Sequence, residues 1–363
     1  MVVFADQNIP YLREALDGKV DVRIAGKNEF SKENLIKNNV KALFIRSTVK
    51  VFRELVEGTP VEFIATATSG TDHIDTEYLD SISLSYFSAP GSNANSVAEF
   101  VIFSILKWNL LTEYDLSQNK IGIIGFGNIG KLVAQYSYLM GFKVLVNDPP
   151  LEKEGYVYPD YVTRASLDKI FESCDVITNH VPLTYTGEFP TFHLINEVLL
   201  SKIKQDSLFI HTSRGGVVAE EALTSLLEEN RIHLSIDVWE HEPIFNSYLA
   251  KNALLALPHL SGYSYDGKLK GALTCLNHFK NHFGIDPETS FIEKLIEDNR
   301  RVKLNFQAPI SIFKLLRSRR FFETDVHSFL EFVDMQDDEK EKAFLELRRN
   351  YPKRRETLYC DFL

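Results

Sequence analysis

Three side chains in the second half of the chain could together transfer a proton and bind an anion. Arg214, Glu242 and His259 occur in the segments TSRGG, DVWEHEP and LPHLSGY. Imidazole titrates near neutral pH, so His259 could accept a hydroxyl proton while a hydride leaves the same carbon. Glu242 beside it would orient the ring and raise its proton affinity. The guanidinium of Arg214 could hold a carboxylate by two hydrogen bonds, so the set suits oxidation of a 2-hydroxy acid.

Each of these residues also has an ordinary structural interpretation. An Arg after a strand often faces solvent or caps a helix, a Glu before Pro is usually exposed, and a His after Pro is often a turn residue. His259 is one of 10 histidines, and its nearest rivals in the sequence are His211 and His241. Spacing alone therefore leaves the catalytic assignment open.

A glycine-rich turn precedes these residues. It consists of Gly125, Phe126, Gly127, Asn128, Ile129 and Gly130. The turn follows a short apolar segment and opens a predicted helix, and Asp148 lies 18 residues after Gly130 at the end of the next predicted strand. In this context the glycines permit a tight turn, close approach of a pyrophosphate and close helix–strand packing. The pyrophosphate would lie at the helix N-terminus, where unpaired N–H groups favour negative charge.

The carboxylate of Asp148 suggests which dinucleotide is bound. It should accept hydrogen bonds from the adenosine ribose hydroxyls and repel a 2′-phosphate. No Lys or Arg follows in residues 149–152. The sequence therefore favours NAD over NADP, the alternative being a glycine turn and a strand-ending Asp without a cofactor.

Strand and helix patterns alternate in two blocks, which predicts an α/β protein with two doubly wound parallel sheets of the Rossmann or flavodoxin-like type. The predicted strands are Val2–Ala5, Val20–Ile24, Ala42–Ile45, Phe63–Ala67, Ile121–Ile124, Lys143–Asn147, Val176–Asn179, Leu208–His211 and Leu234–Val238. The predicted helices are Pro10–Leu16, Lys32–Asn38, Phe52–Glu57, Asn95–Leu111, Ile129–Met140, Leu167–Glu172 and Glu220–Glu229.

We expect three domains. Residues 1–94 and 260–285 would form a discontinuous substrate-binding domain, residues 95–259 an NAD-binding domain, and residues 286–363 a small α+β dimerisation domain. The last domain ends in the basic segment LRRNYPKRRE. Its simplest interpretation is a solvated face. A sharper hypothesis is that one of its arginines reaches the partner subunit's site and binds a substrate phosphate.

Composition restricts the class of protein. The 363 residues are 44% hydrophobic and carry a formal net charge of −10. Such a chain can bury a core, and it is a poor generic nucleic-acid binder because duplex binding depends on Lys and Arg neutralising phosphates. The cysteines (Cys174, Cys275, Cys360) are too few and too far apart for a disulfide framework or a metal site. Without a secretory signal or a membrane-spanning segment, we expect a cytoplasmic protein with no membrane partner.

The glycine turn, Asp148, Arg214, Asp237, Glu242 and His259, in this order and spacing, resemble the D-2-hydroxyacid dehydrogenase family. A narrower resemblance within that family rests on FADQNIPY, IRSTVKV, ATATSGTDHID, APGSNANSVAEF, NDPP, DVWEHEP, PHLSGYSYDGKLKG and LRRNYPKRRE. It implies a homodimeric enzyme of pyridoxal 5′-phosphate biosynthesis. The expected reaction is oxidation of a small phosphorylated 2-hydroxy acid, 4-phospho-D-erythronate, to the 2-oxo acid with NAD.

The resemblance also implies roles for individual residues. Arg214, Glu242 and His259 would be catalytic, with His259 as proton donor and acceptor. Besides the glycine turn, cofactor contacts are implied at Asp148, Val181, Asp237 and Gly262. The family usually has a hydroxyl residue where Val181 stands, so a contact there would use the backbone.

Substrate contacts are expected in two places. The resemblance implies Ser47, Thr68 and Tyr263, and backbone amides around Ser69 and Gly70 would hold the substrate carboxylate with Arg214. Arg46 beside Ser47 could bind the phosphate, or it could be a solvated loop charge.

Two other functions remain open on this sequence. One is a sibling activity such as 3-phosphoglycerate dehydrogenase or hydroxypyruvate/glyoxylate reductase, which would use the same catalytic set. The other is an NAD-sensing binding protein without turnover, although such a protein would not need a base.

Overall fold

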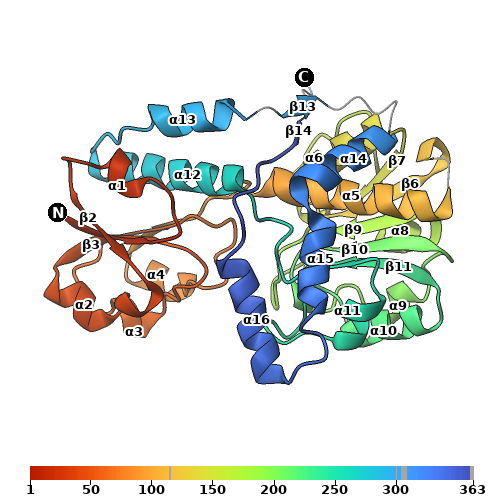
Figure 1. The fold of residues 1–363 in the computed structure, drawn as a ribbon, viewed down its shortest axis with the longest axis horizontal. Helices are drawn as coiled ribbons and strands as arrows, with labels where there is room; N and C mark the ends of the chain where they lie inside the picture. Colours follow the sequence, from red (N-terminus) through yellow and green to blue (C-terminus); the bar gives the residue numbers. More distant parts are fainter. Residues whose placement is uncertain (114–115, 300, 304–308, 360–363) are drawn as a thin grey trace. The chain divides into compact units, whose positions relative to one another are not determined.

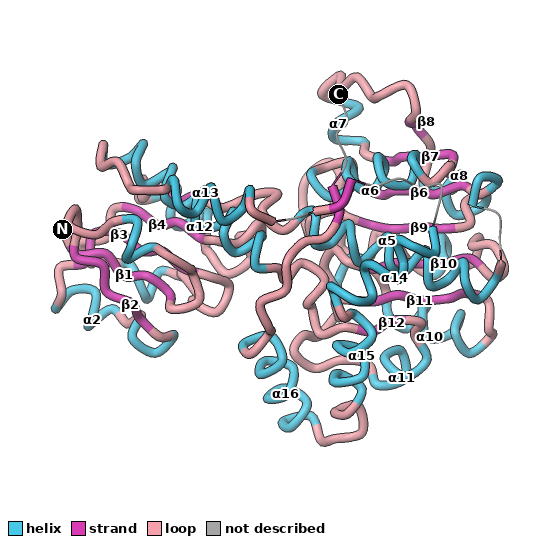
Figure 2. The backbone as a smooth tube through the Cα atoms, turned by 45° about the horizontal axis from the view of Figure 1, so that its top comes forward, coloured by secondary structure: helices cyan, strands magenta, loops and turns pink. Residues whose placement is uncertain are grey.

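The computed structural model describes residues 1–113, 116–299, 301–303 and 309–359. It divides into two compact units, each built on a parallel sheet (Figures 1 and 2). Unit 1 comprises Met1–Asn93 and Ser264–Arg300, and unit 2 comprises Ala94–Tyr263 and Arg301–Leu363. The segment after residue 285 is divided between the units: its residues up to 300 belong to unit 1, and those after 300 belong to unit 2. A separate dimerisation domain over 286–363 therefore stays a prediction.

Unit 1 is built on a five-stranded sheet in the order β2-β1-β3-β4-β5. Its strands are β1 (Val2–Asp6), β2 (Asp21–Ala25), β3 (Val40–Ile45), β4 (Phe63–Thr66) and β5 (Ser85–Phe87). All neighbouring strands pair in parallel, and this order is that of flavodoxin-like doubly wound folds. The predicted fold class is confirmed here, with β5 as an edge strand that the sequence analysis did not identify.

Alternating side chains on the strands of unit 1 build two apolar layers. In β3, Ala42 and Phe44 pack on one face of the sheet, whereas Leu43 and Ile45 pack on the other. This alternation follows from the two-residue period of a strand. Helices cover both faces: α1 (Leu12–Ala15), α12 (Tyr265–Phe283) and α13 (Ser290–Glu297) on the first, and α2 (Lys32–Lys37), α3 (Arg53–Val56) and α4 (Thr76–Ser81) on the second.

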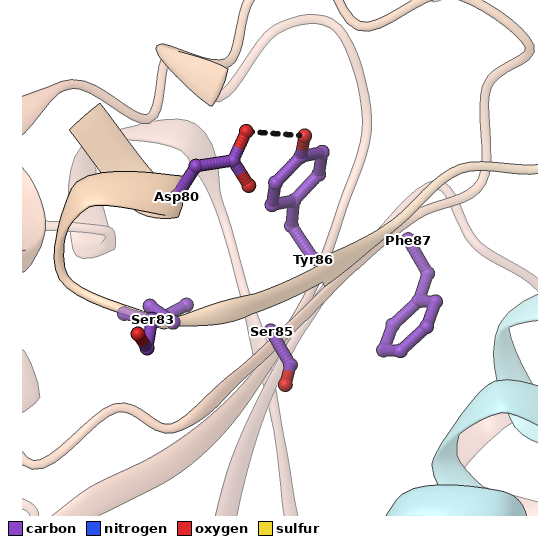
Figure 3. Close-up of a pocket in the computed structure, with 6 residues that line it drawn as sticks. Asp80, Ser83, Ser85, Tyr86 and Phe87 are labelled. Atoms are coloured by element: carbon purple, nitrogen blue, oxygen red, sulfur yellow. Dashed lines mark hydrogen bonds between the residues drawn. The ribbon is translucent and has the colours of Figure 1, made fainter. Parts of the chain in front are cut away.

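A shallow groove of about 430 Å³ runs along the edge strand β5 (Figure 3). Its lining residues are Asp80, Ser83, Leu84, Ser85, Tyr86 and Phe87. The Tyr86 hydroxyl donates a hydrogen bond to Asp80 Oδ2 at 3.4 Å, and the Phe87 ring stacks on His278 at 4.4 Å. None of the site residues expected from the sequence lines this groove, so it is not the candidate active site.

Unit 2 is built on a seven-stranded parallel sheet in the order β12-β11-β10-β9-β6-β7-β8. Its strands are β6 (Lys120–Ile124), β7 (Lys143–Asn147), β8 (Val162–Arg164), β9 (Val176–Asn179), β10 (Ser207–His211), β11 (Ile232–Ile236) and β12 (Leu255–Ala256). Strand order reverses beside β6, as in Rossmann folds. The strand predicted at Leu234–Val238 lies two residues earlier, because the chain turns at Asp237.

Helices cover both faces of this sheet (Figure 1). One apolar cluster contains α5 (Ala94–Thr112), α6 (Asn128–Leu139) and α14 (Pro309–Arg320). The other contains α8 (Leu167–Ser173), α9 (Glu197–Leu200), α10 (Glu220–Glu228) and α11 (Ser247–Asn252). The short helix α7 (Pro149–Lys153) follows β7 directly. Buried side chains occupy every turn of the first three-quarters of α5, as its apolar sequence predicts.

The C-terminal segment packs on unit 2. It contains β13 (Val302–Lys303), α14, α15 (Phe322–Leu330), α16 (Asp337–Arg349) and β14 (Leu358–Tyr359). Phe313 and Phe322 lie against Phe103 of α5, with ring centroids 4.9 and 5.3 Å away. Phe329 lies 4.4 Å from Phe245. These aromatic contacts explain why residues after 300 belong to the same compact unit as the seven-stranded sheet.

Cys174 and Cys275 are buried free thiols, and Cys360 lies outside the described residues. Across the described ranges, no helix has the length and apolar character needed to cross a bilayer.

A fully buried ion pair joins α5 to the C-terminal segment. Arg320 Nε lies 3.2 Å from Glu99 Oε2, and both side chains are 0% exposed. Glu99 Oε1 also accepts hydrogen bonds from the N–H groups of Thr357 and Leu358, at 2.5 and 2.6 Å. Replacing one partner of a buried pair leaves the other charge uncompensated.

We therefore expect Glu99→Gln to lower the free energy of unfolding by about 3–5 kcal/mol, measured by urea denaturation. Asp334→Asn serves as control, because it breaks the exposed Lys251–Asp334 pair, whose side chains are 46% and 78% exposed. That change should cost about 1 kcal/mol or less. Equal effects of the two substitutions would contradict a structural role for the buried pair.

Candidate active site

The turn after β6 contains three glycines, two of which the protein itself constrains. Gly125 has a φ of +91°, which side chains rarely adopt. A Cβ at Gly130 would lie 2.0 Å from the Gly125 carbonyl oxygen, so only glycine allows α6 to approach the turn this closely. Gly127 precedes α6, and a Cβ there would meet nothing within 4 Å. Gly127 and Asn128 are exposed, so the amides at the start of α6 face open space.

An aromatic cluster anchors the turn. The Phe126 ring is 1% exposed and lies 5.3 Å from Tyr158 and 6.1 Å from Tyr156. Ile129 is partly buried against the core between α5 and α6. The turn is therefore preorganised, which suits a site that must present backbone N–H groups to a phosphate.

Asp148 directly follows β7, caps α7 and connects two parts of the site. Its Oδ2 accepts a hydrogen bond from the Phe126 N–H at 2.7 Å, and its Oδ1 accepts one from the Leu151 N–H at 3.1 Å, which caps α7. The first bond ties the acidic residue to the glycine turn. Sequence spacing did not reveal this contact, because it joins residues 22 positions apart through the fold.

His259 and Glu242 form a hydrogen-bonded pair. Nδ1 of His259 lies 2.8 Å from Oε2 of Glu242, and the side chains are 30% and 23% exposed. Glu242 Oε1 accepts a second hydrogen bond from the Trp239 N–H at 3.0 Å. Within the described part of the chain, Nε2 of His259 has no hydrogen-bond partner. The ring is thus oriented by one nitrogen and has the other available for a ligand.

Glu242 is held in its ionised form. Burial alone would raise its pKa, but the charge and hydrogen bond of His259, the charge of Arg348 and the Trp239 amide together keep that pKa below its ordinary value. An ionised Glu242 stabilises a proton on the imidazole. The pair therefore has the polarity of a general acid–base catalyst.

Asp237 supports the turn that carries His259. Its Oδ1 accepts hydrogen bonds from the N–H groups of Leu260 and Ser261 at 2.7 and 2.9 Å, and the Ser261 hydroxyl donates to Oδ2. Gly262 lies in the same turn, which a Tyr263 N–H to Leu260 carbonyl bond of 2.8 Å closes. A cofactor contact by Asp237 and Gly262 stays a prediction, since Asp237 is 1% exposed and bonded within the turn.

Arg214 lies after β10, and its Nη1 donates to the Ser213 carbonyl at 2.9 Å. A Cβ at Gly215 would lie 1.9 Å from the Trp239 carbonyl oxygen, so the Arg214 segment packs directly against the segment that leads to Glu242. Val181 packs on the glycine turn, with its Cγ1 2.9 Å from the Cβ position of Gly125.

The rival His211 occupies a different environment. It is fully buried, and its Nδ1 lies 3.1 Å from Asn179 Nδ2. Burial lowers the pKa of His211 to about 4, so the ring is neutral at physiological pH. His211 is therefore unsuited to the acid–base role proposed for His259, and His241 is exposed on the surface.

The expected substrate residues occur in both units. In unit 1, Arg46 and Ser47 follow β3, whereas Thr68, Ser69 and Gly70 follow the adjacent β4. Parallel neighbouring strands bring these segments to one edge of the sheet. The Thr68 hydroxyl donates to the Gly70 carbonyl at 3.0 Å, and the Ser69 hydroxyl donates to Asn93 Oδ1 at 2.7 Å. Tyr263 belongs to unit 2.

Tyr263 has neighbours that the sequence analysis did not connect with it. Arg348 Nε donates a hydrogen bond to its hydroxyl at 3.3 Å, and Arg320 Nη2 donates to its carbonyl at 3.2 Å. Both arginines come from the C-terminal segment of the same chain. The basic segment is evident in the sequence, but its contact with Tyr263 depends on tertiary packing across 85 positions.

Residues 104–261 match the family described as D-isomer specific 2-hydroxyacid dehydrogenase, NAD binding domain. The chain is 38% identical over 337 residues to erythronate-4-phosphate dehydrogenase of Bacteroides thetaiotaomicron, covering 89% of this chain and 94% of that protein. It is 32% identical to the Wigglesworthia glossinidia brevipalpis enzyme of the same name, over 98% of this chain and 92% of that protein.

Solved structures share the fold. D-lactate dehydrogenase from Aquifex aeolicus, complexed with NAD and lactic acid, aligns with a TM-score of 0.63 at 24% identity, covering 81% of this chain and 98% of that one. A glyoxylate reductase from Paecilomyes thermophila aligns with a TM-score of 0.64 at 23% identity, covering 80% of this chain and 98% of that one. The chain therefore belongs to the D-2-hydroxyacid dehydrogenase family and, within it, to the erythronate-4-phosphate dehydrogenases.

The glycine turn yields a paired prediction. Gly130→Ala forces a methyl group onto the Gly125 carbonyl, so it should destabilise the protein by about 1–3 kcal/mol or more. Gly127→Ala has no such clash and should cost about 1 kcal/mol or less, but its methyl group would lie where a pyrophosphate approaches and should weaken NADH binding. Urea denaturation and NADH fluorescence titration measure the two effects. A stable Gly130→Ala protein would contradict the packing argument.

Proposed function

We propose that this protein is an NAD-dependent dehydrogenase that oxidises 4-phospho-D-erythronate to the corresponding 2-oxo acid. The observation that carries the proposal is the Glu242–His259 pair. The segments carrying the pair, the glycine turn and Arg214 all follow the carboxyl ends of parallel strands of one sheet, which is the edge where such sheets bind ligands. The erythronate-4-phosphate dehydrogenases to which the chain is similar support this choice of substrate.

The residues around the glycine turn fit a dinucleotide. Gly127 leaves space at the exposed start of α6 for a pyrophosphate, and Asp148 retains lone pairs for ribose hydroxyls. The backbone at Val181 and the turn containing Gly262 would contact the remainder of the molecule. NAD, when bound, supplies the hydride acceptor.

Proton transfer falls to His259. As the hydride leaves C2, Nε2 of His259 accepts the proton of the 2-hydroxyl, and the ionised Glu242 stabilises the resulting imidazolium. Arg214 holds the substrate carboxylate, with backbone N–H groups around Ser69 and Gly70. Arg46, Ser47, Thr68 and Tyr263 complete the substrate contacts.

The sibling activities and the NAD sensor have less support. The relatives at 32–38% identity act, by name, on erythronate 4-phosphate. A sensor has no need of a hydrogen-bonded carboxylate–imidazole pair with a free Nε2. A substrate panel that includes 3-phosphoglycerate and glyoxylate distinguishes these functions directly.

We also infer a cytoplasmic homodimer. Support for the homodimer comes from the large apolar side chains that stay exposed in the described part of the C-terminal segment: Val302, Ile310, Phe321, Met335 and Leu345, which are 40%, 57%, 45%, 39% and 41% exposed. Such side chains become buried when a surface is covered.

We expect His259→Asn to reduce kcat by about 10²–10⁴-fold, because it removes the proton acceptor. Asn suits this position, since the residue has a φ of +57° and Asn tolerates that conformation. Turnover of 4-phospho-D-erythronate and NADH affinity are measured side by side. The control is His241→Asn, an exposed histidine in the segment that carries Glu242, which should retain activity. Equal loss of turnover and of NADH binding would mean that His259 is structural.

We expect Asp148→Asn to lower kcat/KM for NAD by about 10–100-fold relative to that for NADP. The substitution retains an acceptor for the Leu151 N–H, loses the acceptor for the Phe126 N–H, and removes the charge that would repel a 2′-phosphate. Steady-state kinetics with both dinucleotides measure the ratio. Glu154→Gln removes an exposed charge just after α7 and should leave the ratio unchanged. An unchanged ratio in Asp148→Asn would exclude this residue as the determinant.

A further inference from the structure

Arg348 in the last turn of α16 reaches the candidate active site of its own chain. Its Nε donates to the Tyr263 hydroxyl at 3.3 Å. The carbon at the centre of the guanidinium lies 5.7 Å from the ring centroids of both Tyr263 and Phe344. The guanidinium therefore lies near two aromatic rings, one of which belongs to a residue expected to contact substrate.

The charge of Arg348 has no carboxylate partner at ion-pair distance within the described ranges. Two other arginines of the C-terminal segment, one buried and one largely buried, differ in this respect. Arg320 lies 3.2 Å from Glu99, and Arg354 pairs with Asp325. A partly buried guanidinium usually has an anion beside it, since burial without one is costly. The pattern indicates that an anion absent from the polypeptide completes the site of Arg348.

The surroundings explain why a cation is needed there. The pKa of Arg348 is raised: burial would lower it, but Tyr263, Glu242 and Asp237 outweigh that effect. Glu242 and Asp237 are thus near enough to act on this charge while making no ion pair with it. They would also repel an anionic substrate, and the protein as a whole carries a net charge of −10. A cation beside them is the simplest compensation.

We propose that Arg348 binds an anionic oxygen group of the substrate within the active site of its own chain. Nε is engaged with Tyr263, which leaves Nη1 and Nη2 as a pair of donors of the geometry that phosphate and carboxylate accept. This inference rests on the proposed function. It differs from the sequence hypothesis, which assigned an arginine of this segment to the partner's site.

The test compares Arg348→Met with Arg349→Met, its exposed neighbour on α16. We expect Arg348→Met to raise KM for 4-phospho-D-erythronate about 10–100-fold while kcat changes little, because the contact binds ground state and transition state alike. Arg349→Met should match the wild type. Arg348→Lys should recover part of the affinity. A fall in kcat at unchanged KM would overturn the proposal and make Arg348 a residue that acts through Glu242.

Unphosphorylated D-erythronate distinguishes the two anionic groups of the substrate. If Arg348 binds the phosphate, Arg348→Met should reduce kcat/KM for the phosphorylated substrate and leave that for D-erythronate unchanged. Equal losses with both substrates would assign Arg348 to the carboxylate. No loss with either would overturn the proposal. Should Arg348→Met fail to fold, Arg348→Gln removes the charge and keeps a polar group near Tyr263.

A binding assay separates this inference from the proposed function. Inorganic phosphate, added to the NADH-bound enzyme, should raise Tm in the wild type and in Arg349→Met and should raise it less in Arg348→Met. This readout needs no turnover. If the wild type fails to oxidise 4-phospho-D-erythronate, the proposed function is wrong, whereas the Tm difference still supports an anion site. If phosphate stabilises all variants equally and KM is unchanged, Arg348 binds no anion.

Discussion

The buried carboxylate of Asp237 determines where His259 lies. Three donors converge on it: two main-chain N–H groups and the hydroxyl of the turn Leu260–Ser261. The main chain of Asp237 also accepts a bond from the His259 N–H at 2.7 Å and donates to the His211 carbonyl at 2.9 Å. The turn is therefore fixed to the end of β11 on one side and to β10 on the other. These hydrogen bonds together hold the backbone of His259 in its left-handed conformation. The position of the backbone in turn sets the orientation of the imidazole.

The same turn is also supported by α5 and, through Arg320, by the C-terminal segment. The Ser96 hydroxyl donates to the Ser261 carbonyl at 2.7 Å, and Arg320 Nη2 donates to the Ser96 oxygen at 2.6 Å. Because Arg320 is paired with Glu99, a buried charge network ends on the carbonyls of the turn. Residues after 300 therefore do more than extend the fold. They complete the polar packing behind the segment that carries His259. This contact adds to the aromatic contacts that make residues after 300 part of unit 2.

Local patterns predicted both sheets, because strand alternation and the glycine turn are properties of short segments. β3 and β6 were found within a few residues of their predicted bounds. The order of the strands within each sheet came from the structure, because the pattern of a single strand does not say which strand lies beside it. The edge strands β5, β8 and β12 have two or three residues each, too few for a period to be recognised. The hydrogen bond from Phe126 to Asp148 and the contact between Tyr263 and Arg348 join residues 22 and 85 positions apart. No spacing rule covers such pairs, since tertiary packing alone brings them together.

Charge is the constraint that connects the remaining features. An acidic protein that binds an anionic dinucleotide and an anionic hydroxy acid cannot use its overall field to attract them. It needs local positive potential instead. Under the proposed function, the exposed amides at the start of α6 would supply it for the pyrophosphate, and individual guanidinium groups would supply it for the substrate. Glu242 increases the need for local positive charge. Its negative charge would stabilise a proton on His259, but it would also repel the negatively charged substrate. The neutral state of His211, whose pKa burial lowers to about 4, removes another source of positive charge from the same region. Arginines can balance Glu242 without titrating in the working range of pH. Under the proposed function, their positions would orient an anionic substrate toward His259.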